Sequence, residues 1–381
     1  MKRITPILIC MAIFKLGVSQ SLPNDSLYLG QTPPGNNPKV FKLAVTPGSF
    51  AAERIVITKD GTEIYYSEIK SYYPIAGAKT KYYKYQNNRW TGPFLLFEGY
   101  MGPTLSRSED TMYVESDFKM FYSVRNKTEW SQPKPFFTDV DSVHYLQVTQ
   151  KGVYYASARS KSSVGLADWS QIEKAGNKYN TISLGFPINN VADNLDFYIA
   201  KNENYIITCP TGPIGISYPI GYGKWSNTRP LDSKINFGIG GWGAYVTSDN
   251  KYLFYTTGTK MDYSDVYVYW VKMGNIVDSM RHTNLPPYVK NKPKPQDAFV
   301  GKLFTYTIPI DAACDEDGST ITYETLLIDS SPLPLWLNFD PKTRTLKGTP
   351  TQAGNVVLRI NAYDDKKVMT AFRFIINVKE K

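Results

Sequence analysis

The sequence predicts an all-β protein of two modules, a β-propeller followed by an Ig-like β-sandwich. Three observations support this: a high aromatic content, a repeated strand-turn-strand pattern over residues 28–281, and a second set of short strands after a change in composition. The 381 residues include 29 Tyr, 18 Phe and 7 Trp, and such side chains suit half-buried, pleated strands better than helices. A chain of this length forms roughly two or three domains.

The first expected element is a secretory signal peptide at residues 1–19. Lys2 and Arg3 precede an apolar run at residues 4–14, and small residues follow at 17–19. This order is typical of an export signal, and the run is shorter than the ~20 residues that span a bilayer. We expect an extracytoplasmic protein, in the periplasm, at the cell surface or secreted, with no transmembrane segment in the mature chain.

Charge and cysteine content narrow the functional classes. The net charge is +9, and Lys2, Arg3 and Lys15 lie in the predicted signal. The remaining basic residues form no dense cluster that would neutralise a row of phosphates, so nucleic acid is not an expected partner. Cys209 and Cys314 fall in different predicted modules, which argues against a structural disulfide.

A repeat predicts the propeller over residues 28–281. Each repeat is a short strand, a polar turn and a second strand of aromatic and β-branched residues, and the repeats recur about every 47 residues, a spacing typical of a four-stranded blade. Five repeats are counted, with equivalent positions at Tyr65, Tyr113, Tyr154, Ile206 and Phe254. A tryptophan follows each position, and we expect these rings to pack between blades: Trp90, Trp130, Trp169, Trp225 and Trp270.

These segments resemble the WD40-like or TolB-like (PD40-type) propeller repeats of exported Bacteroidota-type proteins, whose turns carry Ser-x-Asp-Gly before an aromatic strand. Asp60-Gly61 keeps the Asp-Gly pair, whereas Lys151-Gly152 and Asp249-Asn250 depart from it. Because that family often has six blades and five repeats are counted here, both numbers remain open. The resemblance implies a platform that binds a ligand or another protein.

Residues 282–299 are predicted to be a linker rich in Pro and Lys. Residues 300–381 carry short strands separated by turn residues, which predicts an Ig-like sandwich, with 284 as an alternative start. Leu-Pro-Leu-Trp-Leu-Asn-Phe-Asp at 333–340 and Gly-Thr-Pro at 348–350 resemble the dystroglycan-type cadherin-like and Putative Ig domain families.

The cadherin-like resemblance implies a candidate calcium site. Asp315 and Asp317 match an Asp-x-Asp-Gly turn, Asp364 matches Ala-x-Asp, and Asn284 corresponds to an Asn before the linker prolines. Calcium takes six to eight oxygen ligands, which carboxylates gathered at such turns supply. Ser319 stands where a further acid is common, so a solvated turn is the alternative. No other cofactor is expected.

The sequence contains no convergent catalytic set. Only His144 and His282 are present, which rules out a His-rich zinc site, and we expect both to be ordinary packing or solvent-facing residues. Gly238–Gly243 match G-x-G-x-x-G, but a predicted strand follows where dinucleotide binding needs a helix.

Paired carboxylates are the remaining chemical candidates, because acids near strand starts can face a propeller's central cavity. Two such acids across a sugar would permit glycan hydrolysis; the candidates are Glu53, Glu109, Asp139, Asp141, Asp193 and Asp196. We expect an exported, non-catalytic binding or scaffolding protein of the cell envelope, whose partner is an envelope protein or a carbohydrate. The alternative is a glycan-active hydrolase that uses these carboxylates.

Overall fold

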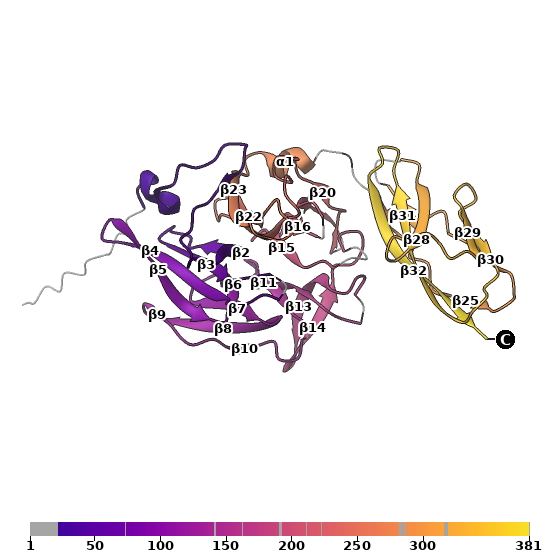
Figure 1. Cartoon of the computed structure of the whole chain (residues 1–381), viewed down its shortest axis with the longest axis horizontal. Coiled ribbons are helices and arrows are strands. Elements are labelled where there is room, and N and C mark those ends of the chain that lie inside the picture. Colours follow the sequence, from indigo (N-terminus) through magenta and orange to yellow (C-terminus); the bar gives the residue numbers. More distant parts are fainter. Residues whose placement is uncertain are drawn as a thin grey trace, which may run out of the picture.

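The computed structural model describes residues 22–380, apart from 73, 141, 162, 190–192, 211, 222, 282–283, 285–286 and 316–318. In this part of the chain, five antiparallel sheets form the blades of a propeller, and a β-sandwich follows (Figure 1). The predicted fold class is confirmed, with five blades. The predicted signal peptide at residues 1–19 lies outside the described residues.

The first three blades follow one another along the chain. Blade 1 contains β2 (Phe50–Ile57), β3 (Glu63–Ile69), β4 (Lys79–Gln86) and β5 (Arg89–Glu98). Blade 2 contains β6 (Met101–Leu105), β7 (Thr111–Ser116) and β8 (Lys119–Asn126), with β9 (Glu129–Trp130) and β10 (Lys134–Phe136) both paired to β8. Blade 3 contains β11 (His144–Val148), β12 (Tyr154–Ala158), β13 (Asp168–Ala175) and β14 (Lys178–Ser183).

Blade 4 contains β15 (Asp196–Ile199), β16 (Ile206–Cys209), β17 (Gly215–Ser217) and β20 (Arg229–Pro230), with a hairpin of β18 (Pro219–Gly221) and β19 (Lys224–Trp225). Blade 5 contains β21 (Trp242–Val246), β22 (Tyr252–Thr257) and β23 (Tyr267–Lys272). The first strands of successive blades contact one another, and β2 also contacts β21. These five strands therefore form a closed ring around the propeller axis.

The N-terminal strand β1 (Lys39–Val40) completes blade 5. It follows the 3₁₀-helix η1 (Asn24–Gly30) and pairs with β23, Lys39 opposite Trp270. The next residue, Phe41, is buried against Phe254 and Trp270, with ring centroids 5.2 Å apart in each pair. Residues from both ends of the propeller sequence thus share one sheet and one aromatic core.

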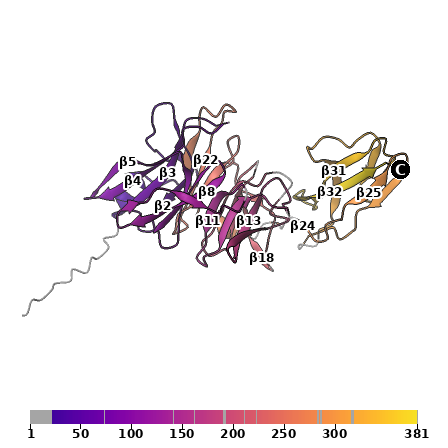
Figure 2. The same ribbon diagram turned by 90° about the horizontal axis from the view of Figure 1, so that it is seen from below.

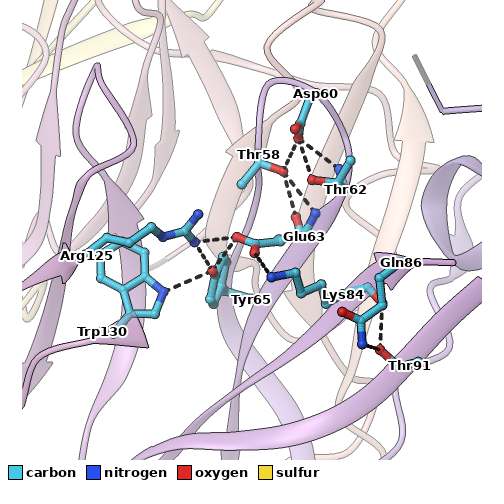
Figure 3. A network of polar contacts seen from close by, with 10 residues as sticks. All are labelled: Thr58, Asp60, Thr62, Glu63, Tyr65, Lys84, Gln86, Thr91, Arg125 and Trp130. Atoms are coloured by element: carbon cyan, nitrogen blue, oxygen red, sulfur yellow. Dashed lines mark hydrogen bonds and ion pairs between the residues drawn. The ribbon is translucent and has the colours of Figure 1, made fainter. Parts of the chain in front are cut away.

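The predicted repeat register is confirmed, because all five equivalent positions lie on the second strands of their blades: β3, β7, β12, β16 and β22. Packing of tryptophan between blades is confirmed for two of the rings. Trp130 of blade 2 donates to Tyr65 Oη of blade 1 at 3.1 Å (Figure 3), and the buried Trp169 of blade 3 donates to the Leu195 carbonyl at 3.3 Å. Trp270 instead stacks on Phe254 of its own blade.

The C-terminal module is a sandwich of two main sheets. One contains β25 (Gln296–Phe299), β32 (Met369–Lys379), β31 (Gly354–Tyr363) and β28 (Thr322–Leu327), and the other contains β26 (Phe304–Thr307), β30 (Thr345–Gly348) and β29 (Leu337–Asp340). A further pair joins β24 (Tyr288–Val289) to β27 (Ala313–Cys314). Fully buried apolar side chains fill the module: Leu346, Leu358, Ile360, Phe372 and Ile376.

The structure differs from the predicted linker at residues 282–299, because two of its segments are strands of the sandwich. β24 pairs with β27, and β25 pairs in parallel with β32 at a sheet edge. Figure 2 shows β24 on the side of the sandwich that faces the propeller. Prolines are tolerated around edge strands, where a missing N–H breaks no ladder bond. The composition rich in Pro and Lys therefore predicted a linker where the structure has two short strands, β24 and β25.

The two modules also contact one another. Helix α1 (Ile276–Arg281) ends the propeller sequence. Phe186, before blade 4, packs against the sandwich core, and the centroid of its ring lies 5.2 Å from Lys292 Nζ. Arg229 Nε donates to the Asn284 carbonyl at 3.3 Å. In the described residues, Cys209 and Cys314 are free, and no helix is long and apolar enough to cross a membrane.

Candidate functional site at the propeller axis

The first strands of four blades are irregular where they approach the axis. Each has a shift in pairing register, a β-bulge, close to its N-terminal end. Bulges reorient side chains and are common beside functional sites. In each bulge one residue has a positive φ of 52–62°: Glu53, Gly102, Tyr145 and Gly243. A side chain at Gly243 would meet the Glu53 carbonyl 2.5 Å from its Cβ, so only glycine fits there.

A buried histidine lies between two carboxylates at this end of the axis. His144 Nδ1 is 2.8 Å from Glu115 Oε1, and His144 Nε2 is 3.2 Å from Asp196 Oδ1. Burial disfavours the charged imidazole, but the two carboxylates outweigh burial and raise the pKa of His144 to about 10. At neutral pH the His144 side chain is therefore a positively charged imidazolium, with both ring nitrogens protonated. This corrects the expectation of an ordinary packing or solvent-facing residue.

Glu53 is a second titratable group of this cluster, and it is 5% exposed. Burial and the Asp196 carboxylate raise the pKa of Glu53 to about 8, so this carboxyl is largely protonated at neutral pH. Tyr145 Oη donates to Glu53 Oε2, and Tyr72 is a further hydrogen-bond partner. Left-handed backbone at a non-glycine residue is strained and persists where the surrounding structure holds it, often at functional sites.

Arg54 lies across the axis beneath this cluster. Its Nη1 donates to Thr104 Oγ1 at 3.0 Å and to the Leu146 carbonyl at 3.3 Å, and its Nη2 donates to the Phe197 carbonyl at 2.7 Å. These acceptors belong to blades 2, 3 and 4, whereas Arg54 belongs to blade 1. The guanidinium also lies 4.4 Å from the centroid of the Tyr145 ring. Arg54 therefore fills the centre of the propeller.

A cavity of about 270 Å³ opens above the cluster, and we call it the acidic cup. Glu53, His144, Asp193 and Asp196 contribute its titratable groups. Four aromatic side chains form part of its wall: Tyr72, Phe118, Trp242 and Tyr263. Trp242 donates to Tyr72 Oη at 2.8 Å, and the Trp242 and Tyr263 ring centroids lie 6.0 Å apart. The cup thus combines an aromatic wall with a polar floor.

The predicted carboxylates are only partly brought together. Glu53, Asp193 and Asp196 line the acidic cup, whereas Glu109 lines a cavity at the other end of the axis. Asp139 accepts from the backbone N–H of Tyr179 at 2.7 Å, and Asp141 lies outside the described residues.

Sequence reasoning missed Glu115 and the part played by His144. Glu115 lies on β7, the second strand of blade 2, and the repeat pattern does not indicate that a side chain there reaches the axis. His144 was easier to identify from the repeat, because it begins the first strand of its blade, as Trp242 does. Comparing these starts between repeats would have drawn attention to it.

Two of the predicted calcium ligands contact each other in the sandwich. Asp364 is 1% exposed and accepts from Asn284 Nδ2 at 2.5 Å. Lys366 Nζ donates to Asn284 Oδ1 at 2.8 Å, and the Val368 N–H donates to Asp364 Oδ1 at 2.8 Å. The Lys366 ammonium group therefore faces the amide oxygen that a calcium ion would use.

The acidic turn after β27 lies close to these residues. Ser319 donates to Asp365 Oδ1 at 3.1 Å, which brings the two predicted turns together. Asp315 directly follows β27, and Asp317 lies outside the described residues. Among the residues that are described, no group of three or more His, Cys, Asp or Glu side chains could hold a metal ion. Calcium at this site stays a prediction.

Comparison with family models identifies the C-terminal module. Residues 286–379 match the family described as "Putative Ig domain". The Ig-like part of the predicted resemblance is thus confirmed, while its cadherin-like part stays a prediction. A search of curated proteins produced no match.

Several solved structures are similar to the chain. For TolB from Acinetobacter baumannii, the identity is 11% and the TM-score 0.38, covering 57% of this chain and 54% of that protein. For a putative 6-phosphogluconolactonase from Bacteroides fragilis, the identity is 13% and the TM-score 0.34, covering 86% and 84%. For a putative α-galactosidase from the same species, the identity is 18% and the TM-score 0.20; the similarity covers 24% of this chain but spans only 17% of that protein. Identities this low are no guide to activity.

Proposed function

We propose that this protein is an exported, non-catalytic binding protein of the cell envelope whose acidic cup takes a small carbohydrate. The observation that carries the proposal is the aromatic wall of Tyr72, Trp242 and Tyr263 beside buried polar groups. Ligand sites typically pair aromatic surface with a few fixed polar groups. Sugars suit such a site, because their C–H faces pack on aromatic rings while their hydroxyls bind polar groups. Export rests on the pattern at residues 1–19.

The contacts of Glu115 and Asp196 argue against a catalytic role for these two carboxylates. Each oxygen of Glu115 already has a protein partner, His144 for Oε1 and the Tyr145 N–H for Oε2 at 3.0 Å. Both oxygens of Asp196 also have protein partners. Oδ1 pairs with His144 Nε2, and Oδ2 accepts from the Gly243 N–H at 3.3 Å. A carboxylate that activates water or protonates a leaving group needs an accessible oxygen. These two carboxylates instead orient His144 and join three blades.

The volume of the cup limits the ligand. About 270 Å³ is just below the range of ~300–1,000 Å³ typical of small-molecule sites. One sugar ring or the terminal unit of a glycan therefore suits the cup better than a polymer segment. The Ig-like sandwich, in contact with the propeller through Phe186, would then connect the binding module to its surroundings.

Calorimetric titration of the full chain with a panel of monosaccharides and disaccharides tests the proposal. We expect at least one sugar to bind, and Trp242→Ala to weaken it by tenfold or more. Phe118→Ser, at a ring that is 49% exposed, tests the same wall with less risk to folding. Trp90→Ala, on the outer strand of blade 1, is the matched control and should leave binding unchanged. Binding by no sugar, or release of reducing sugar from a glycan, would refute the proposal.

A further inference from the structure

A second cavity, of about 590 Å³, lies at the opposite end of the propeller axis. It is surrounded by the hairpins that join the first and second strands of each blade. The second residue of every hairpin lines this cavity: Lys59, Arg107, Gln150, Lys201 and Ser248. Three of these five equivalent positions are cationic. We call this cavity the basic cup.

Two acids of these hairpins, Asp60 and Asp249, bind within their own turns instead of lining the cup. Asp60 Oδ1 accepts from Thr58 Oγ1 at 2.8 Å and from the Thr62 N–H at 3.0 Å, as Figure 3 shows. Asp249 Oδ1 accepts from Thr247 Oγ1 at 2.6 Å within its own turn. Neither Asp60 nor Asp249 lines the cavity. Asp60 and Asp249 thus hold their own turns, and the side chain at the second position of each hairpin lines the cavity.

The three cations donate hydrogen bonds to backbone carbonyl oxygens. Lys59 Nζ donates to the Arg107 carbonyl at 2.6 Å, and Arg107 Nη1 donates to the Gln150 carbonyl at 3.2 Å. Lys201 Nζ donates to the Val148 carbonyl at 3.3 Å. Across the described part of the chain, no ion pair within 4.0 Å involves any of these three side chains. Neutral carbonyls stabilise a cation less than a charged acceptor does.

One acid lies in the lining. Glu109 accepts from the backbone N–H of Lys59 at 2.9 Å. Burial raises the pKa of Glu109, and the positive charges of Lys59 and Lys201 oppose this shift. Burial lowers the pKa of Lys201 to about 8, which still leaves this lysine mostly charged at neutral pH. The positive charges of Lys59, Arg107 and Lys201 therefore exceed the negative charge of the lining. Lys201 is also partly desolvated, whereas Lys59 and Arg107 are exposed to an incoming anion.

We propose that the basic cup binds a small molecule with two or more closely spaced negative charges, carried by phosphate or carboxylate groups. Lys59, Arg107 and Lys201 converge on it from blades 1, 2 and 4. Asn202 and Asn250 add neutral side-chain donors to the lining. This function is separate from carbohydrate binding, because Arg54 fills the axis between the two cups and no residue lines both.

Calorimetric titrations of the full chain with pyrophosphate and with citrate test the proposal. We expect at least one of these anions to bind, and its affinity to fall when the salt concentration is raised from ~0.02 to ~0.2 M, as screening requires. Lys201→Met should weaken binding by tenfold or more. Lys151→Met removes one positive charge from a neighbouring hairpin, at a lysine that pairs with Glu203 outside the cup. This control should change the affinity by less than twofold.

Each outcome decides the matter. Binding of pyrophosphate alone supports a phosphate-bearing ligand, and binding of citrate alone supports a carboxylate-bearing ligand. Either result supports an anion site in the basic cup. Arg107→Gln replaces Lys201→Met if the latter fails to fold. Absence of binding by both anions, or an equal loss in Lys151→Met, overturns the proposal. Trp242→Ala should leave anion affinity unchanged, so failure of the carbohydrate proposal is distinguishable from failure of this one.

Discussion

Replacing Arg54 with Met is expected to destabilise the propeller by about 3–5 kcal/mol. The side chain makes three hydrogen bonds to acceptors on three other blades, and two of these acceptors are buried carbonyls. At roughly 1.5–3 kcal/mol for each bond from a charged donor, their loss would cost about 5–9 kcal/mol. Removing a buried charge recovers part of this, since burial already lowers the pKa of Arg54 to about 10. A net cost of about 3–5 kcal/mol remains.

Differential scanning calorimetry of the full chain measures this effect. For a module of this size, a loss of about 3–5 kcal/mol lowers the melting temperature by roughly 6–20 °C. Arg54→Lys should give an intermediate loss, because an ammonium group keeps the charge but cannot reach three acceptors as a planar fork does. Arg89→Met, at an exposed arginine of the same blade, is the control. If Arg54→Met melts within about 2 °C of the wild type, the side chain does not hold the blades together.

Three further predictions concern packing, charge and metal binding. Trp169→Ala should lower the free energy of unfolding by about 3–5 kcal/mol, because this ring is fully buried. Calorimetry should show a smaller loss of stability for Trp90→Ala, at a half-buried ring. Equal losses in the two variants would contradict the packing. Because the pKa of His144 is raised to about 10, its charge stabilises the fold below pH ~6.5 and this stability disappears as the pH rises through ~10. The melting temperature of the wild type should therefore fall toward that of His144→Gln over this interval, whereas a constant difference would refute the ion pairs. Calcium at millimolar levels should raise the melting temperature of the sandwich, and more so in Lys366→Met, which lacks the ammonium group beside Asn284; identical melting with a chelator would exclude the site.

The blades were predictable because each is a local unit. A strand, a tight turn and an aromatic strand lie within about a dozen residues, so positions such as Tyr65 and Phe254 indicate the second strands directly. The sandwich was predictable for the same reason. The short strands β1 and β24 were not, because each pairs with a partner distant in sequence and contains only two residues.

The axial cluster is harder to predict, since its members come from different blades and from unequal positions within them. Glu53 and Asp196 were candidates because they lie near strand starts. Glu115 comes from the second strand of its blade. The bulge at Tyr145 directs the Tyr145 N–H toward the Glu115 carboxylate. The charge of His144 depends on both carboxylates at once. A pairwise search for acids would miss a group whose role arises from two neighbours in other blades.

The repeat also explains why the two ends of one axis differ in charge. Each first strand contributes its N-terminal bulge to one end and its following hairpin to the other. At one end, the carboxylates of Asp193 and Asp196 line the cavity. At the other end, Asp60 and Asp249 bind within their own turns, and cations such as Lys201 line the cavity. An open channel would let water and ions screen these opposite charges. Because the Arg54 guanidinium occupies the centre of the ring and binds three of its strands, the acidic and basic cups are separate sites of opposite character.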